Sequence, residues 1–366
     1  MSVLLFWLRP SWLFSCKSGE CYTKLANYRN HKAISGHPMN HSAYTIANRT
    51  YETRHPLADE VHFDAAENYV FHLPDLAVLA VEGAKAADFL QGQVTCDVRL
   101  VTPSTVQRGA LCNLKGRIMA LLDVIDWQGY HLVLQKDLID DTKNSLAKTA
   151  MLSRVSLQVK TDWHAVGFLI NNSSQTLPRL TLPDESGHAA AADDYCCYSL
   201  GNNLFLALIR QDRISHYLEG FPASQHRGTL GWHYLQLLNR HVTIYPETRG
   251  LFLAHRLDLH KQGYISFDKG CYKGQEIIAR THYKAKLKHG LKVFTVFSDK
   301  PLVPGSRLFN EGTQQEIGEL VDCCPKGSDC YLIAVSIQFE HAQVVTVENQ
   351  SEPLTLLDAL ENPKRH

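Results

Sequence analysis

Short strand-like runs with turn residues between them occupy the C-terminal end of the chain, and they constrain the fold more than any other feature. Apolar and β-branched residues fill the runs, while Pro-Gly and Asn-Glu-Gly turns separate them. Short strands at close spacing are typical of small antiparallel barrels. We therefore predict an antiparallel β-barrel over residues 289–366, with strands at Leu291–Phe297, Arg307–Phe309, Glu316–Val321, Tyr331–Phe339 and Val344–Val347.

The chain before the barrel mixes strands with short helices. Leu76–Val81 is typical of a buried strand, and the residues around Lys115-Gly116 predict a hairpin. Asp140–Met151 has the spacing of an amphipathic helix, with acidic residues at its start. The predicted class is α+β, and 366 residues are enough for two or three domains. The predicted parts before the barrel are residues 61–160, completed by about 228–288, and residues 161–227.

The first sixty residues give no comparable signal. Residues 9–60 lack sustained periodicity and are rich in His, Asn, Ser, Tyr and Lys. We predict that residues 1–60 are a disordered extension or follow a mis-assigned start, with Met39 as the true start; a functional extension is the alternative. The apolar run Val3–Leu8 is too short to span a bilayer, so no membrane association is expected.

Composition narrows the function classes. Lys+Arg and Asp+Glu are equal at 37 each, which argues against a general nucleic-acid binder because phosphate contacts need a basic excess. Ten cysteines are scattered without a CxxC pair, so neither a disulfide scaffold nor a metal site is expected. Free thiols in this number are typical of a cytoplasmic protein.

The segment from Lys269 to Glu276 carries the densest chemistry. Gly270 and Gly274 allow backbone conformations closed to other residues and let a ligand approach the main chain. Cys271 precedes a predicted helix, and Lys269 and Lys273 flank it. A helix dipole and nearby ammonium groups favour the thiolate, so Cys271 is a candidate reactive thiol. The alternative interpretation is a glycine-flanked helix cap with a packed cysteine.

Three stretches of the chain are similar to one known family. Lys269-Gly270-Cys271-Tyr272-Lys273-Gly274-Gln275-Glu276 resembles the KGCYxGQE signature of the YgfZ family of folate-binding proteins, a branch of the glycine-cleavage T-protein superfamily. The segment Phe89–Val98 resembles the family's FLQGQVTxDV stretch, and Gly109–Ile118 resembles its following hairpin. The likeness runs from about residue 70 to about residue 350.

The resemblance implies a T-protein-like multi-part ring around a central folate cavity. It also implies tetrahydrofolate, or a one-carbon derivative, as the cofactor. Trp232 matches a family tryptophan linked to folate binding, whereas a second one corresponds to Leu76, which removes one stacking surface. The implied folate-site residues are Leu76, Trp232, Lys269, Gly270, Cys271, Tyr272, Gly274, Gln275 and Glu276.

The implied role is that of an accessory factor for iron–sulfur cluster assembly or repair, which affects tRNA thio-modification indirectly. Its implied partners are folate and iron–sulfur assembly proteins or client enzymes. A folate-dependent aminomethyltransferase is the alternative, but the strand position of that branch's catalytic aspartate corresponds to Met119 and Ala120 here, with Asp123 expected two pleats from the site.

A third alternative is an enzyme that modifies RNA directly. The basic residues after the signature would hold a polyanion, or would form the solvated face of a hairpin. These residues are Arg280, Lys284, Lys286 and Lys288, with His282 and His289. Because the net charge is zero and this basic run is single, direct nucleic-acid binding is not expected.

Overall fold

The structure, a computed structural model, describes residues 43–359, and their strands form four sheets. The first is a two-stranded hairpin of β1 (Ala43–Ile46) and β2 (Arg49–Glu52). The helices are α1 (Leu57–Glu60), α2 (Ala86–Gln91), α3 (Ile139–Ser153), α4 (Ile214–Leu218), α5 (Thr229–Leu238) and α6 (Gln275–Lys284). Within residues 43–359, none of these helices has the length and apolar character needed to cross a bilayer.

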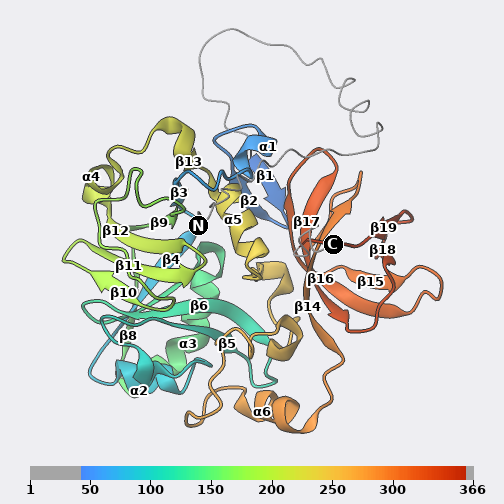
Figure 1. Cartoon of the computed structure of the whole chain (residues 1–366). Helices are drawn as coiled ribbons and strands as arrows, with labels where there is room; N and C mark the ends of the chain where they lie inside the picture. The colour runs from blue at the N-terminus through green and yellow to red at the C-terminus, as the bar shows by residue number, and fades with distance from the viewer. Residues whose placement is uncertain (1–42, 360–366) are drawn as a thin grey trace, which may run out of the picture. The chain divides into compact units, whose positions relative to one another are not determined.

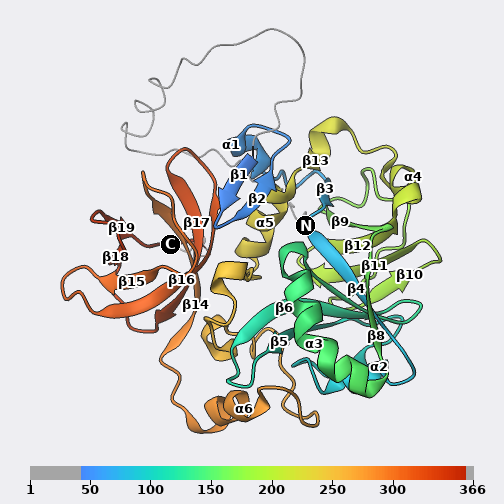
Figure 2. The same ribbon diagram turned by 180° about the vertical axis from the view of Figure 1, so that it is seen from behind.

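A five-stranded antiparallel sheet follows the first predicted part of the chain. Its order is β5-β6-β7-β4-β8, and α3 packs on its outer side against β4 and β8 (Figure 2). Along β6, Ala120 and Leu122 face the core, whereas Met119, Leu121 and Asp123 face the other way. The strands are β4 (Leu76–Glu82), β5 (Gln107–Cys112), β6 (Ile118–Asp126), β7 (Tyr130–Gln135) and β8 (Ser156–Lys160).

A six-stranded sheet has the order β10-β11-β12-β9-β3-β13. Most of its strands come from residues 161–227, but β3 precedes the whole five-stranded sheet in sequence. Hence the predicted boundary at residue 160 separates the two sheets except for β3. The strands are β3 (Tyr69–Leu73), β9 (Trp163–Leu169), β10 (Ala189–Ala191), β11 (Tyr195–Gly201), β12 (Leu204–Arg210) and β13 (His226–Arg227).

The C-terminal region forms a seven-stranded, antiparallel and nearly closed barrel, which confirms the predicted fold class. Its order is β19-β18-β15-β16-β17-β14-β20, and β14 also packs near β19 from the other edge. The strands are β14 (His289–Phe297), β15 (Arg307–Asn310), β16 (Glu316–Pro325), β17 (Cys330–Gln338), β18 (Val344–Val347), β19 (Pro353–Thr355) and β20 (Leu357–Asp358).

Helix α5 joins these layers. It packs against β3 of the six-stranded sheet and against β16 and β17 of the barrel, as its central place in Figure 1 shows. Seven of its ten residues are buried, which follows from having apolar partners on opposite sides. A helix in this position can present side chains to a space between the sheets.

The prediction that residues 1–60 lie outside the fold is wrong for residues 43–60, which form β1, β2 and α1. Arg49 is buried and donates to Asp137 (2.8 and 2.6 Å) and to the Ile244 carbonyl (3.1 Å). Buried Glu60 accepts from the main-chain nitrogens of Arg54 and His55. Hydrophobic periodicity misses this region because its strands are short and its anchors are polar. Residues 1–42 lie outside the described residues.

A chain that starts at Met39 is expected to keep the melting temperature of the full chain, whereas one that starts at residue 61 should lose several degrees. The longer truncation removes β2 and the buried contacts of Arg49 with Asp137, and breaking such contacts costs on the order of 2–4 kcal/mol. Differential scanning calorimetry of the three chains tests this. A lower melting temperature for the Met39 chain would contradict the prediction.

Candidate functional site

A central cavity lies where the five-stranded sheet, the six-stranded sheet and α5 meet. Its lining includes Leu121 and Asp123 from β6, Leu206 from β12, and Trp232 and Gln236 from α5. The volume is about 110 Å³, against roughly 300–1,000 Å³ for pockets that enclose a drug-sized ligand. The cavity therefore has room for one end of a folate-sized molecule.

Two of the predicted site residues, Trp232 and Leu76, line this central cavity. The Trp232 indole packs against the Phe71 ring, with 5.3 Å between ring centroids. A Cβ atom added at Gly167 would lie 2.6 Å from the indole, so the absence of a side chain on β9 makes room for it. The indole is held in one orientation and is 7% exposed.

The other predicted site residues lie elsewhere. Cys271, Tyr272, Gly274, Gln275 and Glu276 line a second pocket, the Cys271 groove, together with Gly92, Gln93, Leu114, Thr149 and Lys273. Neither pocket has Lys269 or Gly270 among its lining residues. The structure thus brings Trp232 and Leu76 together and places the signature segment at a separate surface.

The three stretches that resemble the family pack on one another around Gly274. Gly274 has φ 88° and precedes α6, and a Cβ atom there would lie 2.5 Å from the Asn113 carbonyl oxygen. The main-chain nitrogen of Lys273 donates to the Gly92 carbonyl at 3.1 Å. Only glycine fits this close approach at positive φ. The predicted helix start and the first-turn carboxylate of Glu276 are confirmed.

Lys269 ties the signature segment to the Phe89–Val98 stretch. Its side chain is buried, and Nζ donates to the carbonyl oxygens of Val94 (2.8 Å) and Cys96 (2.6 Å). Burial lowers the pKa of Lys269 to about 8. This structural tie was not evident from the sequence, which suggested only a positive charge beside Cys271.

Cys271 is expected to react with iodoacetamide at pH 8 well before Cys112 and Cys197, because it is exposed and they are buried. Burial raises the pKa of Cys112 to about 12, so only about one molecule in ten thousand carries that thiolate at pH 8. Burial also raises the pKa of Cys197. Peptide mass spectrometry over a pH series measures the three rates. If Cys271 reacts no faster than the other two near neutral pH, it is not an activated thiol.

A polar wall of the central cavity was missed by the sequence analysis. Asp123, expected two pleats from the site, lines the cavity, because the cavity extends along the β6 face that carries Leu121 and Asp123. Tyr198 Oη donates to Asp123 Oδ2 at 2.9 Å, and Arg108 Nε lies 3.8 Å from Oδ1. Burial raises the pKa of Asp123. The cavity therefore contains a carboxylate.

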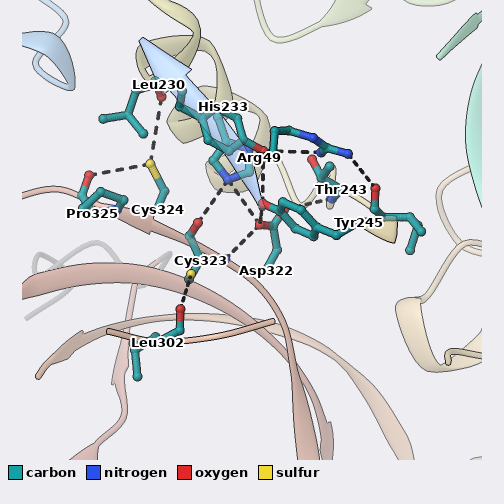
Figure 3. Close-up of polar contacts among 12 residues, drawn as sticks. Arg49, Leu230, His233, Thr243, Tyr245, Leu302, Asp322, Cys323, Cys324 and Pro325 are labelled. Carbon is teal, nitrogen blue, oxygen red and sulfur yellow. Dashed lines mark hydrogen bonds and ion pairs between the residues drawn. The ribbon is translucent and has the colours of Figure 1, made fainter. Parts of the chain in front are cut away.

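A buried polar network supports the cavity from the barrel side (Figure 3). Asp322 on β16 is fully buried and accepts from the main-chain nitrogens of Thr243 and Cys323, each at 2.9 Å. Tyr245 Oη donates to the same carboxylate at 2.6 Å. His233 Nε2 lies 3.1 Å from the Cys323 carbonyl oxygen, so it carries the proton and donates. The network fixes α5, and with it Trp232, against the barrel.

Proteins similar in sequence were found in three bacteria, each described as "tRNA-modifying protein YgfZ". The one from Colwellia psychrerythraea is 26% identical over 230 residues, which is 62% of this chain and 71% of the relative. The one from Vibrio atlanticus is 25% identical and covers 66% of this chain and 74% of its own. For Hamiltonella defensa the identity is 28%, with 61% and 68% covered. No family model matches the chain.

The fold also has a solved counterpart. The aminomethyltransferase T of the glycine cleavage system from Bartonella henselae superimposes with a TM-score of 0.68 and 14% identity. The likeness covers 88% of this chain and 94% of that one. Together with the sequence relatives, this places the chain: it belongs to the YgfZ family and has the aminomethyltransferase T fold.

Proposed function

We propose that this protein binds tetrahydrofolate, or a one-carbon derivative of it, in the central cavity and acts as an accessory factor for iron–sulfur proteins, with tRNA modification as an indirect consequence. The relatives described as tRNA-modifying proteins and the aminomethyltransferase T fold support the proposal. Its partners would be iron–sulfur assembly proteins or client enzymes of the cytoplasm.

The observation that carries the proposal is the chemistry of the cavity lining. The Trp232 indole offers an aromatic wall against which a pterin ring can pack. Buried polar atoms of Asp75, Gln135 and Gln236 line the same space without protein partners. An aromatic wall with a few unpaired polar groups is typical of a site for a heterocycle. These residues fit the ring end of a folate, and a bound folate would supply one-carbon chemistry.

One observation favours the alternative, a folate-dependent aminomethyltransferase. The sequence argument against it rested on Met119 and Ala120, neither of which can carry a proton. Asp123 lines the cavity on the same strand, and burial raises its pKa, which is a property of carboxylates that move protons. The electrostatic partner of Asp123 is Arg108, at 3.8 Å.

Calorimetric titration of the full chain tests folate binding. Tetrahydrofolate and its methylene form are expected to bind with one site per chain. Heat no greater than that of dilution for both ligands would contradict the proposed cofactor.

A second experiment separates the accessory factor from the enzyme. An accessory factor with Asp123→Asn should still restore cluster-enzyme activity in a strain that lacks the protein, provided that the variant binds folate. An aminomethyltransferase should instead form methylenetetrahydrofolate from an aminomethyl donor and lose that activity in Asp123→Asn. Folate-dependent turnover abolished by Asp123→Asn would therefore favour the enzyme.

A further inference from the structure

Three side-chain atoms that line the central cavity are buried and lack a hydrogen-bond partner among the described residues. They are Asp75 Oδ1, Gln135 Oε1 and Gln236 Nε2. Buried polar atoms in folded proteins are paired in the great majority of cases, because an unpaired one costs about 1–3 kcal/mol. Three such atoms in one cavity indicate a bound molecule that pairs them. Ordered water is the other occupant, and the experiment below distinguishes the two.

The neighbours of Gln236 fix which side of its amide faces the cavity unpaired. Arg108 Nη1 lies 2.7 Å from His241 Nε2, and a guanidinium can only donate, so Nε2 accepts. Burial and the Arg108 charge lower the pKa of His241 to about 3, so the neutral ring carries its proton on Nδ1. Nδ1 then donates to Gln236 Oε1 at 3.2 Å. Gln236 Nε2 is therefore a hydrogen-bond donor without a partner.

Asp75 places an acceptor in the same cavity. It precedes β4, and its main-chain oxygen accepts from the Lys136 nitrogen at 2.7 Å. Because Leu76 pairs with Gln135, the side chains of Asp75 and Gln135 lie at the same end of the β4–β7 pair. Burial raises the pKa of Asp75, and a ligand that donates two adjacent N–H groups would favour the ionised carboxylate.

We propose that Asp75 and Gln236 bind the 2-amino-4-oxo edge of a pterin ring. Asp75 accepts from the 2-amino group and N3–H, and Gln236 Nε2 donates to O4. This assignment rests on the proposed folate function and names the part of the ligand that the cavity recognises. The edge has two donors beside one acceptor, which complements a carboxylate and an amide N–H. A 2,4-diaminopteridine would instead set an amino group against the Gln236 donor.

The first test is Asp75→Asn, with Asp299→Asn, an exposed loop residue of the barrel, as the matched control. Calorimetric titration with tetrahydrofolate should give binding about 10- to 100-fold weaker for Asp75→Asn and unchanged for the control. Since Asp75 Oδ1 has no protein partner, the melting temperature of Asp75→Asn without ligand should equal or exceed that of the wild type. Wild-type affinity in Asp75→Asn overturns the assignment and leaves water as the occupant.

The second test uses folic acid and aminopterin, which differ only in the 4-oxo or 4-amino group. The wild type should prefer folic acid. Gln236→Glu keeps the acceptor toward His241 but replaces the donor, so its preference should shift toward aminopterin by about tenfold or more. An unchanged ratio overturns the role of Gln236. If the wild type binds no folate at all, the proposed function fails; if it binds folate and both variants bind like the wild type, only this assignment fails.

Discussion

Replacing Asp322 with alanine is expected to lower the free energy of unfolding by about 3–5 kcal/mol. The carboxylate is fully buried, and the variant leaves the main-chain nitrogens of Thr243 and Cys323 without their acceptor. The Tyr245 hydroxyl loses its 2.6 Å partner as well. Each buried donor left unpaired costs about 1–3 kcal/mol. Chemical denaturation followed by circular dichroism measures the loss.

Asp299→Ala is the matched control, because Asp299 is exposed in the loop after β14. It should change the free energy of unfolding by less than about 0.5 kcal/mol. A loss below about 1 kcal/mol for Asp322→Ala would show that water satisfies the abandoned donors, and the network would then not hold α5 against the barrel.

Replacing Trp232 with alanine is expected to weaken tetrahydrofolate binding by about 1–3 kcal/mol, or roughly 5- to 150-fold. The variant removes the aromatic wall of the central cavity. It also removes the contact with Phe71 and with the main chain at Gly167, so stability should fall by about 3–5 kcal/mol. The titration therefore belongs at a temperature where circular dichroism shows the variant folded.

Trp163→Ala serves as the control for this loss. Trp163 packs on Trp127, with 4.0 Å between ring centroids, and does not line the central cavity. It should leave the affinity for tetrahydrofolate unchanged. Trp232→Phe keeps an aromatic face and should retain most of the binding. Full affinity in a folded Trp232→Ala variant would remove Trp232 from the folate site.

The features that could be predicted from the sequence are those that neighbouring residues decide. The alternation and turns after Gly290 predicted the barrel, because strand periodicity and turn chemistry are local properties. Gly274 followed by a first-turn Glu276 predicted the start of α6 for the same reason. The family was recognised from three motifs, which the structure shows packed together around Gly274 and Lys269.

The central cavity was decided by the tertiary structure. Its polar atoms come from Asp75 before β4, Asp123 on β6 and Gln236 on α5, and no local pattern relates positions so far apart in the chain. Asp123 seemed remote because distance was counted along one strand, whereas the cavity follows the strand face. Arg49 was missed for a related reason, since its burial depends on Asp137 and Ile244. The sequence by itself determined the elements and the family; which polar side chains share one buried space depended on long-range packing of the sheets around α5.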